Sequence, residues 1–324
     1  MVSRWLYYSS DALGWVAAVT RPQHLRLVAP FHSIFYSPVV IALLGGHLAA
    51  EGLEPTLTVA EHAGGTVNAL LEGGADVAVS GLIRSFDLAD RGGPRLIHFA
   101  AINDRNGFFL LSRAPRPGFA WSDLVGRTVL SFSGAPTPWL CMQAVLRRHG
   151  IDPARVNFVR HLTTSEAVAT FRAGHADFLE HGPPVVDELV RDGIGHLVAS
   201  MGTATGPLAF TSCMTTPEVL LHRRELLLPL VRGLARAQRW IRDARIEEIA
   251  DVIAPAFPEI TAEIRLRAVE RYVHQSTWAS HPALTREGFE ALQEILLAGG
   301  FIAQRHRFED LVDTSLVEQA MEGR

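Results

Sequence analysis

Short apolar runs alternate with apolar residues spaced by three and four over the first third of the chain. The runs predict strands at residues 25–29, 56–59, 76–80 and 95–101, and the spaced positions predict helices at 39–50, 67–72 and 85–89. Strands that alternate with helices in this way are typical of parallel βαβ units with right-handed crossovers. The pattern therefore predicts an α/β fold.

A second α/β segment follows a break in this pattern. An apolar strand is predicted at residues 107–112, and the prolines and glycine of 114–118 indicate a linker or a domain boundary. Beyond it we expect strands at 128–132, 156–159, 176–179, 197–200 and 208–214, helices at 139–149, 165–172 and 183–191, and a loop at 201–207. From Pro217 onward the apolar spacing predicts helices, at 218–242, 245–254, 262–275 and 286–297.

Length and composition bound the function classes. At 324 residues the chain exceeds the size at which one hydrophobic core keeps growing, so two domains are expected. The net charge of −4 comes from mixed acids and bases without a basic stripe, which disfavours nucleic acid as a partner. All 30 basic residues are arginine. The absence of lysine excludes a Schiff-base lysine, a pyridoxal-phosphate anchor and a P-loop lysine, and we expect no cofactor.

The cysteines and histidines give little support for a metal. Cys141 and Cys213 match no zinc or redox spacing and are best interpreted as buried apolar residues. A disulfide between them stays open, because pairing depends on distance in space. His175 and His181 with Asp177 superficially suggest a metal site, but the predicted strand between the histidines separates them. We expect no metal ligands.

The first 23 residues form an N-terminal extension. Asp11 interrupts their apolar run and no cleavage site follows, so the segment does not match a secretory leader. No run of eighteen or more apolar residues occurs, and we expect no membrane-spanning segment. The sequence as written predicts a protein that stays in the cytoplasm.

A series of short phrases resembles a known family. In chain order they are FYSP at 35–38, GHLAAEGLE at 46–54, GGT at 64–66, GADVA at 74–78, SDLVGRTV at 122–129 and GHADF at 174–178. They are colinear with phrases of the type II periplasmic substrate-binding proteins that bind sulfonates, taurine, nitrate and thiamine-pyrimidine precursors for ABC importers. The chain resembles this family over about residues 24–242.

The resemblance implies two α/β lobes, each a mostly parallel sheet, with the C-terminal helices packed on the first lobe. The two crossing strands would be 107–112 and 208–214. Lobe I would then comprise residues 24–112 and 208–324, and lobe II residues 113–207. The family implies one small-molecule ligand in a cleft that closes by hinge motion, an ABC permease as partner, and a periplasmic location. That location disagrees with the missing leader.

Five loops are expected to meet at the ligand, because ligands of open α/β sheets lie beyond the carboxyl ends of the strands. Helix N-termini at this edge favour anionic groups. The loops are 31–38, 62–66, 81–84, 133–137 and 180–182. The expected ligand-binding residues are Ser33, Phe35, Tyr36, Gly65, Thr66, Ser80, Arg84, Ser133, Thr137, Trp139, Glu180 and His181.

The residues of the first lobe have structural alternatives. Phe35 and Tyr36 could stack on a planar ligand or pack at a strand end. Arg84 could clamp a carboxylate or sulfonate, or it could pair with Asp87 on the surface. An anionic, aromatic or amphoteric ligand is therefore expected.

The second lobe leaves similar alternatives. Ser133 and Thr137 could bind ligand or cap a helix, and Trp139 could face the cleft or anchor its helix. Glu180 directly follows the apolar residues 176–179, so we expect it at the carboxyl edge of the sheet, paired with a ligand amine or with an arginine.

Two enzymes share the family's fold, and neither activity transfers readily. The pyrimidine synthase needs a cysteine-rich motif, a lysine and histidines, whereas this chain has no lysine and no cysteine cluster. The aromatic sulfinate desulfinase uses a cysteine in its first loop, where this chain has His32-Ser33-Ile34-Phe35, and its histidine position falls near Asn68. No GxSxG elbow occurs. A cytoplasmic enzyme or ligand sensor on this scaffold remains the alternative to a binding protein.

Overall fold

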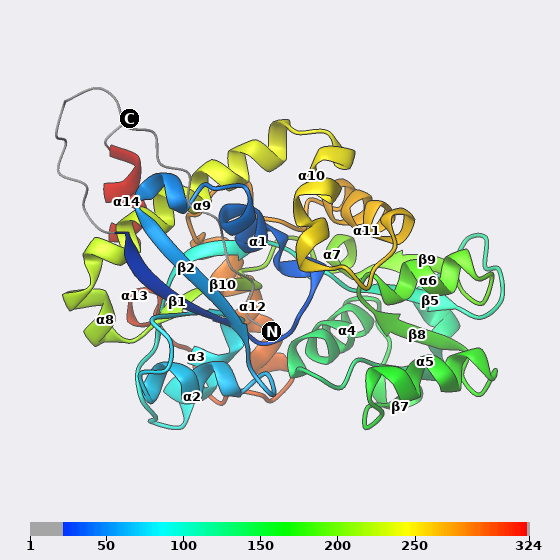
Figure 1. The fold of residues 1–324 in the computed structure, drawn as a ribbon. Coiled ribbons are helices and arrows are strands. Elements are labelled where there is room, and N and C mark those ends of the chain that lie inside the picture. The colour runs from blue at the N-terminus through cyan, green and yellow to red at the C-terminus, as the bar shows by residue number, and fades with distance from the viewer. Residues whose placement is uncertain (1–21, 323–324) are drawn as a thin grey trace, which may run out of the picture.

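The computed structural model describes residues 22–322, which contain two five-stranded sheets (Figure 1). The strands of the first sheet are β1 (Gln23–Ala29), β2 (Leu53–Val59), β3 (Val77–Ser80), β4 (Ile97–Asn103) and β10 (Thr211–Thr215). Those of the second sheet are β5 (Phe109–Ser112), β6 (Thr128–Leu130), β7 (Asn157–Val159), β8 (Phe178–His181) and β9 (His196–Ser200).

Both sheets have the same topology. The first has the order β2-β1-β3-β10-β4 and the second the order β7-β6-β8-β5-β9. The first three strands in each order are parallel, and the fourth runs antiparallel to both of its neighbours. The chain therefore folds as a two-lobed, mostly parallel α/β protein, as the sequence predicted.

Helices cover the faces of both sheets. They are α1 (Ser37–Leu44), α2 (Gly65–Leu71), α3 (Ile83–Asp90), α4 (Pro136–Arg148), α5 (Thr164–Arg172), α6 (Val185–Arg191), α7 (Met201–Thr205), α8 (Pro217–His222), α9 (Arg224–Asp243), α10 (Ile246–Ile253), α11 (Ala262–His274), α12 (Arg286–Ala298), α13 (Phe308–Leu311) and α14 (Ser315–Glu322). Short 3₁₀ turns are η1 (Ile34–Tyr36), η2 (Ala49–Glu51), η3 (Trp121–Leu124), η4 (Pro153–Arg155) and η5 (Ala254–Ala256).

Three predicted elements differ from the structure. The helix predicted at 39–50 ends at Leu44, because Gly46 adopts a positive φ of 73° and turns the chain before η2. The predicted loop at 201–207 contains α7, whose N-cap Ser200 accepts a hydrogen bond from the Thr203 backbone N–H. The helix predicted at 218–242 is divided at Arg223 into α8 and α9.

The strand pairing refines the predicted crossings. β5 pairs only within the second sheet and β10 only within the first, so the chain passes between sheets at residues 104–108 and 201–210. In Figure 1 α9 and α14 lie with the first sheet, whereas α11 extends toward the second. Arg271 of α11 forms an ion pair with Asp187 of α6, whose side chain is fully buried. The C-terminal helices thus also contact the second lobe, and the lobe boundaries stay a prediction.

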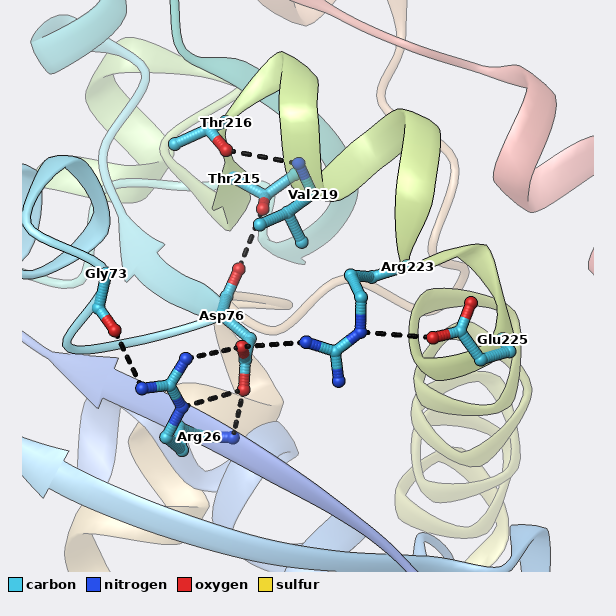
Figure 2. Close-up of polar contacts among 8 residues, drawn as sticks. All are labelled: Arg26, Gly73, Asp76, Thr215, Thr216, Val219, Arg223 and Glu225. Atoms are coloured by element: carbon cyan, nitrogen blue, oxygen red, sulfur yellow. Dashed lines mark hydrogen bonds and ion pairs between the residues drawn. The ribbon is translucent and has the colours of Figure 1, made fainter.

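A buried aspartate holds the amino-terminal edge of the first sheet together. The Asp76 carboxylate, next to β3, accepts hydrogen bonds from the Arg26 backbone N–H at 2.9 Å and from Arg26 Nη2 at 2.8 Å. Figure 2 shows Arg223, at the break between α8 and α9, reaching the same carboxylate at 3.8 Å. Thr215 donates to the Asp76 carbonyl at 2.7 Å. One residue thereby connects β1, β3, β10 and the start of α9.

The cysteines do not pair. Cys141 lies in α4 and Cys213 in β10; both are free and buried, and burial raises the pKa of each thiol to about 12. None of the helices within residues 22–322 is both long and apolar enough to span a membrane. The prediction about a secretory leader falls on residues outside those that the structure describes.

Candidate functional site

A cleft of about 320 Å³ lies between the two lobes. It opens at the carboxyl ends of β1 and β3 in the first sheet and of β6 and β8 in the second. All five predicted loops contribute to its wall, and further wall residues come from the passages between the sheets and from α11. The cleft is therefore where open α/β sheets bind ligands.

Aromatic rings form much of the wall. Phe31 of the first lobe and Phe132 of the second meet edge to face across the cleft, with ring centroids 5.7 Å apart. Phe35 lies 5.7 Å from Phe210 and packs against Gly107, where an added Cβ would come within 2.3 Å of the Phe35 ring. These rings exclude water and provide flat apolar contact surface for a ligand.

Arg84 is the cation of the cleft wall. The first turn of α3 places its half-buried guanidinium in the wall, where it makes no hydrogen bond or ion pair with the described residues. Asp87, its expected surface partner, instead pairs with Arg91 at 2.7 Å. Burial lowers the pKa of Arg84, and Asp87 offsets only part of this effect. An anion in the cleft would supply the missing counter-charge.

Hydroxyl groups surround the apolar wall. Five of its residues have hydroxyls that form no hydrogen bond with the rest of the described chain, namely Tyr36, Ser80, Thr137, Thr211 and Tyr272. The helix α4 begins at this wall, and no side chain caps its N-terminus. Its backbone N–H groups and the positive end of its dipole therefore also favour an anion.

His181 is held as a neutral ring. Its Nδ1 lies 3.0 Å from the Gly182 carbonyl, which can only accept, so Nδ1 carries the proton and Nε2 accepts from the Thr164 hydroxyl at 3.1 Å. Burial lowers the pKa of His181 to about 4. This ring can form a wall or accept a hydrogen bond, but no carboxylate orients it as the base of a catalytic triad requires.

Seven of the predicted ligand-binding residues lie in the cleft wall. These are Ser33, Phe35, Tyr36, Ser80, Arg84, Thr137 and His181. Their role as ligand contacts stays a prediction, but the structure brings them together from four separate loops.

Four other predicted residues lie outside the wall because each packs locally. Thr66 is buried at the start of α2, where its hydroxyl donates to the Ala63 carbonyl, and Gly65 precedes it in the same turn. Ser133 donates to the Leu162 carbonyl at 2.6 Å. Trp139 packs edge to face on Phe158 with ring centroids 4.4 Å apart, so it anchors α4.

Glu180 was placed wrongly at the carboxyl edge of the sheet. The strand β8 continues through Glu180 to His181, so the glutamate lies within the second sheet, fully buried and outside the cleft wall. Neither carboxylate oxygen has a hydrogen-bond partner among the described residues. Burial raises the pKa of Glu180 to about 7, and Ser131 and Arg160 offset only part of this rise.

Several wall residues were not predicted. Phe108 and Phe210 lie on the two passages between the sheets, and Tyr272 lies in the middle of α11. The two phenylalanines fall within apolar runs that signal only a strand, and Tyr272 fits the amphipathic spacing of its helix. Residues 22–322 contain no group of three or more His, Cys, Asp or Glu side chains placed to hold a metal ion.

Comparison with known proteins supports one fold. The model of a family described as the NMT1-like family matches residues 31–254. The candidate binding protein YtlA of Bacillus subtilis is 26% identical over 290 residues, which is 89% of this chain and 87% of YtlA.

Two solved structures show the same two-lobed arrangement. The periplasmic aliphatic sulphonate binding protein SsuA of Escherichia coli is 15% identical, with a TM-score of 0.69, over 87% of this chain and 94% of SsuA. The enzyme DSZB in complex with biphenyl-2-sulfinic acid is also 15% identical, with a TM-score of 0.70, over 94% of this chain and 100% of DSZB. At these identities the likeness establishes the periplasmic-binding-protein fold.

Proposed function

Because the chain belongs to the NMT1-like family, we propose that it is a solute-binding protein that holds one small organic anion between its lobes. Its partner would be the permease of an ABC importer, and its working location the periplasm, as for the sulphonate binding protein it is similar to. The ligand would carry a carboxylate or sulfonate on an apolar, preferably flat, body.

One observation carries the proposal: a half-buried arginine without an ion pair in an aromatic cleft. A desolvated guanidinium costs free energy unless an anion compensates it, and Arg84 has no such partner among the described residues. The surrounding rings and hydroxyls match the body and the oxygen atoms of an organic acid.

The enzyme or sensor alternative has less support. Ser33 stands in the first loop and accepts a hydrogen bond from the Phe35 backbone N–H at 3.2 Å, and both cysteines are buried outside the cleft wall. Thr164 contacts His181, but a neutral ring that donates to a carbonyl lacks the orienting carboxylate of a catalytic triad.

The test is a thermal-shift screen of sulfonates, sulfinates, aromatic carboxylates, nitrate, pyrimidines and amino-acid-like amines, followed by calorimetric titration. A ligand that binds the folded state raises the melting temperature. We expect organic anions to do so, and Arg84→Ala to weaken their binding by about 2 kcal/mol or more, roughly 30-fold. Arg91→Ala is the matched control, since Arg91 lies two turns further along the same helix and pairs with Asp87.

Two results would contradict the proposal. Equal affinity of wild type and Arg84→Ala would remove the anion assignment. Conversion of the bound compound, detected by mass spectrometry after incubation, would replace the binding protein by an enzyme.

A further inference from the structure

A second apolar depression, which we call the side groove, adjoins the cleft. It has a volume of about 210 Å³. It shares Phe31, His32, Ser33 and Tyr36 with the cleft, so the loop that follows β1 forms a wall of both. The cleft lies at the carboxyl ends of β1 and β3, and the side groove at those of β1 and β2. The two depressions are therefore neighbouring parts of one sheet edge.

The side groove is apolar and open. Its remaining walls are Ala29, Val40, Leu44, Leu57, Val59, Ala256 and Phe257. Leu44 and Val59 are 41% and 48% exposed, which makes them two of the most exposed large apolar residues in the described chain. The only ionisable side chains of the wall are His32 and Tyr36, and the His32 ring tilts over Phe257 and pairs with Glu259 at 3.5 Å.

This arrangement separates charge from apolar surface along one path. Arg84 lies in the cleft but not in the side groove, and Leu44 and Val59 lie in the side groove but not in the cleft. A ligand with an anionic head at Arg84 and a long apolar tail would satisfy the arginine and cover the exposed leucine and valine at the same time.

We propose that the side groove binds the apolar tail of the molecule whose anionic head lies in the cleft. The ligand class is then the amphiphilic organic anions, rather than short or strongly hydrated ones. This inference rests on the proposed function and names the substrate class of the same site.

The experiment is a chain-length series, with n-alkanesulfonates and n-alkanecarboxylates titrated from the ethyl to the decyl member. Each methylene buried improves the dissociation constant by about fourfold. In the wild type we expect this gain to continue after the cleft is filled. In the double variant Leu44→Gln, Val59→Gln the gain should stop at a shorter chain, while the affinity for the ethyl member stays unchanged.

Leu71→Gln is the matched control. Leu71 lies on α2, is 45% exposed and belongs to neither depression, so its loss of apolar surface should leave the series unchanged. A gain that ends at the same chain length in wild type and double variant overturns the side-groove assignment while short anions still bind. Failure of every member to bind the wild type would instead overturn the proposed function, and the side-groove assignment with it.

Discussion

The two sheets share one topology but treat equivalent acids differently. Asp76 precedes β3 and Asp177 precedes β8, the matching strand of the second sheet, and each accepts a hydrogen bond at 2.9 Å from the backbone of the matching first strand. The Asp76 side chain is 3% exposed and has two arginines, whereas Asp177 is 36% exposed and has Arg127 at 3.4 Å. The same backbone role therefore carries very different electrostatic weight.

Three residues further on, the difference reverses. The first sheet has Val79 where the second has Glu180, and the next residues, Ser80 and His181, both reach the cleft wall. The first sheet satisfies its buried carboxylate at the edge, and the second leaves one without a partner inside. The comparison teaches that a shared topology specifies where strands lie, while the surrounding helices decide whether a buried charge is compensated.

Breaking the Asp76 network should have the largest effect. Asp76→Asn replaces charge-assisted bonds to Arg26 by neutral ones and leaves two arginines without their shared partner. We expect a loss of about 3 kcal/mol in the free energy of unfolding at pH 7, measured by urea titration. Because Arg26 bonding lowers the pKa of Asp76, the wild type should lose this stability only in acid, as pH falls through the lowered pKa. A loss under 1 kcal/mol would show that the network adds little.

Removing the buried glutamate should have the opposite sign. Burial raises the pKa of Glu180 to about 7, so the folded state holds a proton that the unfolded chain releases near its ordinary value of 4.5. Its contribution to stability therefore falls as pH rises from about 5 to 8. We expect Glu180→Leu to gain about 2 kcal/mol at pH 8 and less at pH 5.

The difference between variant and wild type isolates this residue. Asp104, whose pKa burial raises to about 6, is present in both proteins and cancels. A pH-independent difference between Glu180→Leu and wild type would mean that Glu180 does not titrate in this range.

The smallest effect is expected at Asp177. Asp177→Asn removes a partly exposed ion pair with Arg127, for which about 0.5 kcal/mol is typical. The loss should shrink further in high salt, since both side chains reach solvent. A cost equal to that of Asp76→Asn would remove the contrast between the two sheets and would point to the backbone hydrogen bond alone.

Much of the fold could be predicted from the sequence because strands and helices alternate with strong periodicity. The boundaries failed where a local choice decided them. Gly46 ends α1 early, Ser200 starts α7 in an expected loop, and Arg223 leaves the helix to reach Asp76. The insertion of β10 between β3 and β4 is a long-range pairing that periodicity does not encode.

The candidate site could be predicted only in part. Loops at the carboxyl ends of strands gave Arg84 and Tyr36, because topology alone brings those ends together. Phe210 and Tyr272 escaped, since each has an ordinary position within its own segment and reaches the cleft through tertiary packing. Glu180 failed because a polar residue after an apolar run was taken as the end of a strand that in fact continues to His181.

The second lobe leaves and re-enters the first at adjacent points, since Asn103 at the end of β4 is paired with Thr211 at the start of β10. Topologically it is an insertion between two hydrogen-bonded neighbours. The entropy of closing an inserted loop grows only with the logarithm of its length, about 0.6 kcal/mol for each doubling. The pairing of β4 with β10 is therefore nearly indifferent to the size of what is inserted, and the second lobe is free to diverge, or to be exchanged for another, while the first sheet keeps its register.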